Sequence, residues 1–131
     1  MYRMPLEVLP AHIDRLGHVN NVVYLQWMQT VAEAHWRAVA RPEDQAGIVW
    51  VVTRHEIDYE SPAFPGDRLE ARTWVGEWTA ATCERFIEIR RASDARLLVR
   101  ARSVWVALDA KTGRPKRIAR GLAERFVTPR E

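Results

Sequence analysis

The 131-residue chain is 47% hydrophobic and 28% charged, and its formal net charge is +3 at neutral pH. This size and composition suit one folded domain, which we take as residues 1–131, and they exclude an intrinsically disordered chain. The single cysteine excludes an internal disulfide and a cysteine-based zinc cluster. The start of the chain lacks the apolar stretch of a signal peptide, and its apolar runs are far shorter than the roughly 20 residues of a membrane helix. We therefore expect a cytoplasmic protein that contacts no membrane.

The positive charge is carried almost entirely by arginine, because Lys111 and Lys116 are the only lysines among the 20 basic residues. The arginines are spread along the chain and interleaved with acids, which favours a compositional bias over a nucleic-acid surface. We therefore expect no nucleic-acid partner and keep such binding as a weaker alternative. The planar fork of N–H donors on a guanidinium matches phosphate geometry, so binding of an anionic small ligand is kept as an alternative.

In chain order, residues 2–9 alternate loosely in hydropathy and predict a first strand, which a loop follows as far as Gly17. Asn20 and Asn21 stand where a helix N-cap is expected, because a short side-chain oxygen accepts a hydrogen bond from a free first-turn N–H. Residues 22–39 carry apolar side chains at spacings of three and four and predict a long helix. Further apolar positions lie on its other faces, so we expect this helix to be largely buried.

The chain beyond Gly47 is rich in β-branched and aromatic residues that alternate with polar ones. The predicted strands are residues 48–59, 67–77, 82–90 and 97–108, and residues 118–126 predict a short terminal helix. Short turns between consecutive strands favour antiparallel pairing. The sequence therefore predicts an α+β fold in which a curved, antiparallel five-stranded sheet wraps one long central helix.

The segment most suggestive of chemistry places a carboxylate, Asp14, seven residues before the predicted helix start at Asn21. The first N–H groups of a helix are unpaired and carry partial positive charge, so they can hold an oxygen that becomes negative during a reaction. A nearby carboxylate can act as a nucleophile or as a general base. Together they would form an acyl-transfer site that needs no metal, although an aspartate in this position is also a common cap or turn residue.

This segment has the pattern Asp14-x-x-Gly17-His18-Val19-Asn20-Asn21-x-x-Tyr24, followed by an aromatic-rich helix. Two later segments are Ile57-Asp58-Tyr59-x-x-Pro62-Ala63-x-x-Gly66-Asp67 and Asp109-x-Lys111-Thr112-Gly113-Arg114-Pro115. In combination they strongly resemble the hotdog-fold acyl-CoA thioesterases, and among these the 4-hydroxybenzoyl-CoA thioesterase-like family. The resemblance covers about residues 6–127 and implies the hotdog fold.

The resemblance implies an enzyme that hydrolyses an acyl-CoA thioester to a free carboxylic acid and CoA. Asp14 matches the family's catalytic carboxylate, which attacks the thioester carbonyl or activates water. The backbone N–H of Asn21 matches the group that polarises the thioester oxygen, and Gly17 matches a glycine that lets the loop turn. Active sites of this family lie between two subunits, so we expect a homodimer or a homotetramer. The resemblance implies no cofactor and no metal.

The candidate substrate-binding residues are Gly17, His18, Asn20, Tyr24, Arg54 and His55. His18 either fixes the loop or, as in hotdog hydratases, works with an aspartate in proton transfer. Asn20 is also expected as a structural cap, and Tyr24 as core or pocket wall. Arg54 and His55 are neighbours on a predicted strand, so one of them should face inward.

One departure from the family concerns the CoA phosphates. Some relatives carry basic residues after the third strand that reach these phosphates, whereas residues 78–82 here are uncharged. Either other arginines contact the phosphates, or an acyl-carrier protein carries the acyl group. The arginines considered are Arg54, Arg85, Arg90 and Arg91. A protein of the same fold that binds an acyl ligand without hydrolysing it is the alternative to the enzyme.

Overall fold

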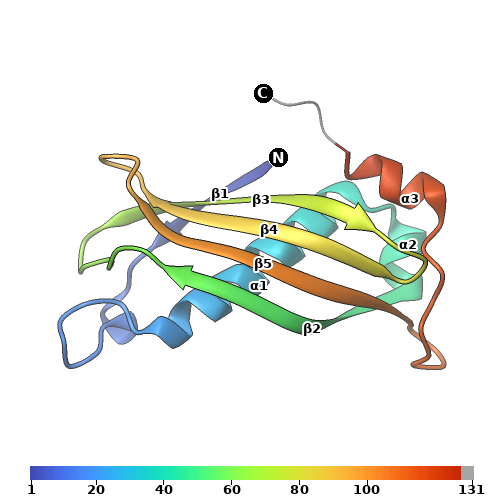
Figure 1. Cartoon of the computed structure of the whole chain (residues 1–131), viewed down its shortest axis with the longest axis horizontal. Coiled ribbons are helices and arrows are strands. Elements are labelled where there is room, and N and C mark those ends of the chain that lie inside the picture. The colour runs from blue at the N-terminus through green and yellow to red at the C-terminus, as the bar shows by residue number, and fades with distance from the viewer. Residues whose placement is uncertain (128–131) are drawn as a thin grey trace.

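The computed structural model describes residues 1–127, in which one long helix lies across one face of an antiparallel sheet (Figure 1). The long elements are α1 (Asn21–Val39), β1 (Tyr2–Glu7), β2 (Ile48–Tyr59), β3 (Arg68–Trp78), β4 (Thr82–Arg91) and β5 (Leu97–Asp109). The strand order is β1-β3-β4-β5-β2, and every neighbouring pair is antiparallel. The predicted α+β architecture is confirmed. Residues 128–131 of the predicted domain lie outside the described residues.

Helix α1 presents one side to the sheet. Its buried side chains recur at spacings of three and four and are Val23, Tyr24, Trp27, Met28, Val31, Ala32 and His35. The opposite side is exposed, and Val22 on that side keeps 58% of its surface accessible. The expectation that the helix is largely buried is therefore wrong for the single chain, because the sheet covers only one side of α1.

Two short helices complete the described chain, α2 (Pro42–Gly47) and α3 (Arg120–Arg125). Helix α2 was not predicted from the sequence, because a six-residue helix is too short to show a hydropathy period. Pro42 stands in its first turn, where the missing proline N–H costs no hydrogen bond. Beyond α3, Phe126 packs with Leu122 in a small core cluster at one end of the sheet. No helix within residues 1–127 is long and apolar enough to cross a membrane.

The inward positions of strand β4 alternate regularly with outward ones, and one of them holds a charged residue. Along β4 the inward side chains are Cys83, Arg85, Ile87 and Ile89, and all four are buried. A buried arginine in such a row is unusual, because charged side chains are rarely fully buried unless they are paired. Arg85 therefore marks the part of the interior that differs from an ordinary apolar core.

Strand β2 forms one border of the sheet, so one of its edges has no strand neighbour within the described residues. The register of β2 against β5 shifts between Val52 and Arg54. Such a bulge reverses which side chains face inward. As a result His55 turns toward the interior while Arg54 is exposed, so one of the two neighbours faces inward as the sequence predicted.

Candidate active site

The loop before α1 is a short, closed hairpin made of residues 12–20. Asn20 N–H donates to His12 O at 2.9 Å, and Asp14 N–H donates to His18 O at 3.0 Å. An antiparallel bridge joins Ile13 and Val19 between them. Because the second arm of this hairpin runs directly into α1, the pairing holds Asp14 close to the start of the helix.

The Asp14 carboxylate is positioned through one of its two oxygens. Oδ1 accepts a hydrogen bond from Leu16 N–H at 2.8 Å, whereas Oδ2 lies 3.8 Å from His18 Nδ1, beyond hydrogen-bonding distance. The Asp14 side chain is 24% exposed, and Oδ2 has no hydrogen-bond donor among the hydrogen bonds of the described residues. Gly17 closes the turn with φ +82°, a value that suits glycine, and its N–H donates to Asp14 O at 3.1 Å.

His18 contacts the backbone as well as facing Asp14. Its Nδ1 lies 3.2 Å from Val19 O, and the tautomer with a proton on Nδ1 donates a hydrogen bond there. Val19 in turn is anchored, because its N–H donates to Ala63 O at 2.9 Å. These contacts fit a His18 that fixes the loop, which is one of the two roles expected from the sequence.

The first turn of α1 leaves one backbone donor available. Asn20 is the N-cap, and its Oδ1 accepts from Val22 N–H at 3.0 Å while its carbonyl accepts from Val23 N–H at 2.9 Å. Within residues 1–127, Asn21 N–H donates a hydrogen bond to no acceptor outside the helix. This donor sits at the positive end of a 19-residue helix. The arrangement can therefore stabilise an oxyanion.

Tyr24 lies beneath this turn and belongs to the core, with 2% of its surface exposed. Its ring makes edge contacts with Trp27 and Tyr59, with centroids 5.4 and 5.8 Å apart. Burial raises the pKa of the Tyr24 hydroxyl. Tyr59 links the end of β2 to the helix start, because its hydroxyl donates to Asn21 O at 3.4 Å.

Arg54 and His55 are not joined to the hairpin by any hydrogen bond or ion pair found in the described chain. Arg54 pairs with Glu56 at 2.6 Å on the exposed side of β2. His55 Nδ1 lies 2.6 Å from the hydroxyl of buried Ser103, and burial lowers the pKa of this imidazole. The structure thus groups Asp14 with its hairpin neighbours and leaves this pair on a separate strand.

The other arginines considered for phosphate binding are already engaged. Arg91 donates to Asp67 at 3.2 Å and to Asp94 at 3.0 Å, and Arg90 pairs with Glu88 at 3.2 Å. Arg85 is buried rather than exposed. None of the three is a free surface cation in this chain. The described residues also hold no cluster of three His, Cys, Asp or Glu side chains suited to a metal ion.

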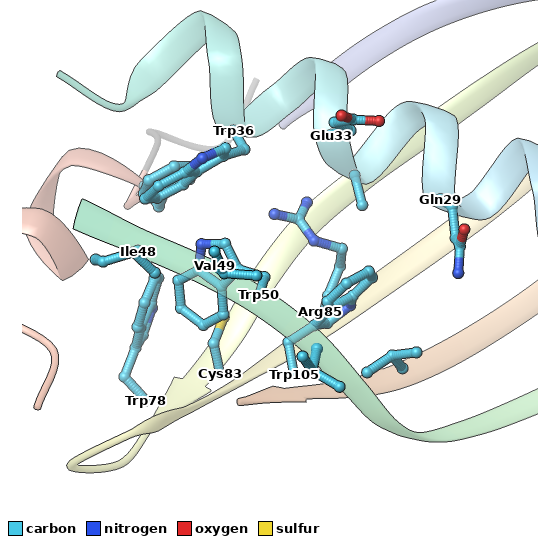
Figure 2. A pocket seen from close by; sticks show the side chains of 14 residues that line it. Gln29, Glu33, Trp36, Ile48, Val49, Trp50, Trp78, Cys83, Arg85 and Trp105 are labelled. Atoms are coloured by element: carbon cyan, nitrogen blue, oxygen red, sulfur yellow. The ribbon is translucent and has the colours of Figure 1, made fainter. Parts of the chain in front are cut away.

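A cavity of about 550 Å³ lies between the second half of α1 and strands β2, β4 and β5, and the sequence alone did not place it there. Its aromatic lining consists of Trp36, Trp50, Trp78, Trp105 and Phe126. Figure 2 shows the Arg85 guanidinium reaching from β4 toward the α1 side of this cavity, in the direction of Glu33 and Trp36. The available signal was the alternation along β4, which placed an arginine at an inward position.

Cys83 also lines this cavity and is buried. Burial raises the pKa of its thiol to about 12. A thiol of this kind is protonated at neutral pH and is therefore a poor nucleophile. The cavity wall thus contains no activated cysteine.

Comparison with solved structures confirms the hotdog fold that the sequence predicted. A thioesterase from Thermus thermophilus, solved with coenzyme A and Zn, is 23% identical, covers 96% of this chain and 97% of its own, and has a TM-score of 0.83. A 1,4-dihydroxy-2-naphthoyl-CoA thioesterase from Synechocystis is 20% identical, with coverage of 95% and 94% and a TM-score of 0.80. At these identities the likeness establishes the fold.

The sequence comparison establishes the family. The model of the thioesterase-like superfamily matches residues 8–126, and the chain belongs to this superfamily. A curated relative is the chloroplastic acyl-(acyl-carrier-protein) hydrolase FATB3 of Cuphea viscosissima, which is 31% identical over 80 residues. The match covers 61% of this chain and 19% of that protein, so it spans about a fifth of the relative's length. The resemblance stated from the sequence motifs is confirmed.

Proposed function

We propose that this protein hydrolyses an acyl thioester to a free carboxylic acid and a thiol, with Asp14 as its catalytic carboxylate. The observation that carries the proposal is the hairpin that holds Asp14 beside the start of α1. One carboxylate oxygen is fixed by Leu16 N–H, and the other lies 3.8 Å from His18 Nδ1 without a hydrogen bond to it. Membership of the thioesterase-like superfamily supports the reaction class.

The reaction would use two groups at the helix start. The thioester oxygen accepts a hydrogen bond from Asn21 N–H, which stabilises the negative charge that develops when the carbonyl carbon is attacked. Asp14 Oδ2 either attacks that carbon or takes a proton from the water that attacks it. The carbon–sulfur bond then breaks, and the thiolate leaves and is protonated. In the route where Asp14 attacks, water then cleaves the acyl anhydride formed on Asp14, which releases the acid and restores the carboxylate. Both routes consume one water and release one acid and one thiol.

The acyl carrier is CoA or an acyl-carrier protein. CoA is supported by the Thermus thermophilus relative that was solved with coenzyme A, and a carrier protein is supported by the Cuphea viscosissima relative. In this chain Arg90 and Arg91, two of the arginines considered for phosphate contact, are already paired with acids. His18, Asn20, Tyr24, Arg54 and His55 remain the proposed substrate-binding residues, together with Gly17.

The protein would assemble as a homodimer or a homotetramer. The free edge of the 12-residue strand β2 offers unpaired backbone groups to a second copy. Val49 and Val51 are exposed along this strand, with 49% and 43% of their surface accessible. Light scattering should give a mass of at least two chains, and a Val51→Glu variant should shift that mass toward the monomer. A wild-type monomer would contradict this assembly.

Thiol release from a panel of substrates tests the reaction. The panel holds short, long and aromatic acyl groups, each attached to CoA and to acyl-carrier protein. We expect turnover well above spontaneous hydrolysis on at least one carrier, and the ratio of kcat/KM values for the same acyl group identifies that carrier. Calorimetric binding of an acyl-CoA with no thiol release on either carrier would instead support a non-catalytic binding protein.

A further inference from the structure

Arg85 is a buried cation without a counter-ion. Its side chain is 7% exposed, and no carboxylate within residues 1–127 forms an ion pair with it. Burial lowers the pKa of Arg85 to about 10, so the guanidinium still carries its charge at neutral pH. Glu33, an acid that lines the cavity from α1, already forms an ion pair with Arg37, with 2.6 Å between Glu33 Oε1 and Arg37 Nη2. An unpaired buried charge is costly, which suggests that something else neutralises it.

One edge of the guanidinium is left without a protein partner. Nη1 donates to Thr73 Oγ1 and to His35 Nδ1, each at 2.9 Å. The Thr73 hydroxyl carries no charge. His35 is neutral at pH 7, because burial and the neighbouring Arg85 lower its pKa to about 3. Nε and Nη2 donate to no described residue, although Arg85 lines the cavity. These two N–H groups lie side by side and match the two oxygens of a carboxylate.

Apart from Gln29 and Glu33 on the α1 side, the rest of the cavity wall is largely apolar, and its buried polar groups are hydrogen-bond donors. Trp36, Trp50, Trp78 and Trp105 provide flat apolar surfaces. The buried indole N–H groups of Trp50, Trp78 and Trp105 have no acceptor within the described residues, and no buried side-chain acceptor of this wall is left unpaired there. A ligand with one negative group and an apolar body complements such a wall. A phosphate dianion fits poorly, because a single cation would leave part of its charge uncompensated.

We propose that this cavity is a binding site for a carboxylate carried on an apolar body, aromatic or aliphatic, and that Arg85 pairs with the carboxylate through Nε and Nη2. The site is separate from Asp14 in the same chain. His35, which contacts Arg85, follows Asn21 by 14 residues, and the helical rise places it about 21 Å along the axis from the helix start. The proposal therefore does not depend on thioester hydrolysis.

Equilibrium binding to the intact protein tests the proposal, and the cavity tryptophans provide a fluorescence signal that calorimetry can confirm. The probes are two matched pairs, 2-naphthoate with 2-naphthalenemethanol and decanoate with decanol. We expect at least one carboxylate to bind at least about tenfold more tightly than its alcohol, because a charge-assisted pair is lost with the alcohol. The better pair identifies the body as aromatic or aliphatic. Equal affinities for carboxylate and alcohol, or no binding, would overturn the proposal.

Three variants assign the effect to Arg85. Arg85→Met should abolish the preference for carboxylate, and Arg85→Lys should keep part of it. Arg100→Met removes a 60% exposed arginine from the neighbouring strand and should bind like the wild type. Asp14→Asn should also bind normally, which separates this site from the proposed reaction. An Arg85→Met protein that retains the carboxylate preference would overturn the proposal.

Thermal unfolding without ligand separates a ligand-binding arginine from a structural one. Arg85→Met should unfold within a few degrees of the wild type, because it removes an unpaired buried charge along with two hydrogen bonds. Addition of the tighter carboxylate should raise the unfolding temperature of the wild type and leave that of Arg85→Met unchanged. If Arg85→Met does not fold, the matched probe pairs on the wild type and on Arg85→Lys still show whether the cavity prefers a carboxylate and whether Arg85 causes that preference. A second copy whose acid already pairs with Arg85 would block carboxylate binding and contradict the proposal.

Discussion

Asp14 and His18 face each other across the hairpin before α1, joined by a backbone hydrogen bond of 3.0 Å while their side chains stay 3.8 Å apart. The backbone bond fixes where the carboxylate lies, and the side-chain separation leaves Oδ2 without a hydrogen bond to the imidazole. His18 is instead within 3.2 Å of Val19 O. This geometry favours a loop-fixing His18 over an Asp–His dyad of the hydratase type.

Replacement of Gly17 should lower activity through the backbone of the hairpin. An added Cβ would meet no atom within 4 Å, but Gly17 has φ +82°, which disfavours alanine by about 1 kcal/mol or more. Gly113 is a matched control, because it has φ +71° and equally open surroundings. We expect Gly17→Ala and Gly113→Ala to lose similar unfolding free energy in urea, whereas only Gly17→Ala should lose much of its kcat. Equal kcat values for the two variants would show that the hairpin conformation is unimportant for the reaction.

Loss of the α1 cap should be measurable as a loss of stability. Asn20→Ala removes the acceptor of Val22 N–H and should reduce the free energy of unfolding by about 1 kcal/mol. Asn20→Ser keeps a short side-chain acceptor and should recover most of that loss. Urea denaturation of the three proteins makes the comparison. If Asn20→Ala were as stable as the wild type, the cap would contribute nothing in solution.

His35 should make the protein less stable as the pH falls. Burial and Arg85 lower the pKa of His35 to about 3, whereas the unfolded chain has the ordinary value of 6.5. Between these two values the unfolded state binds a proton that the folded state does not, so stability falls from pH 6.5 downward, by at most about 1.4 kcal/mol per pH unit. His35→Gln should flatten this part of the profile of unfolding free energy against pH. Parallel profiles for the two proteins would mean that His35 does not titrate in this way.

Much of the fold was predictable because it depends on local patterns. The strands from β2 onward start and end within one residue of the predicted ranges, since period-two alternation is clear on a half-buried sheet. Asn20 was predictable as a cap because its side chain acts on the backbone two residues away. Helix α2 was missed because six residues give too little periodicity.

The candidate site was predictable only in part. The motif from Asp14 to Tyr24 is contiguous, so one stretch of sequence contains the turn of the hairpin, its second arm and the helix start. The contact between Arg85 and His35 joins residues 50 positions apart, and no local pattern predicts which arginine meets which histidine. The inward turn of His55 depends on a bulge that arises from strand pairing, which the sequence of one strand does not contain.

The most direct test of thioester hydrolysis by Asp14 is kcat/KM for the Asp14→Asn variant on the best substrate of the panel. The amide keeps the size of the side chain but can neither attack the carbonyl nor accept the proton, so we expect a fall on the order of 10²–10⁴. Asp58→Asn, on the exposed face of β2, should retain the wild-type value. If Asp14→Asn also retained it while folding normally, Asp14 would not be the catalytic carboxylate.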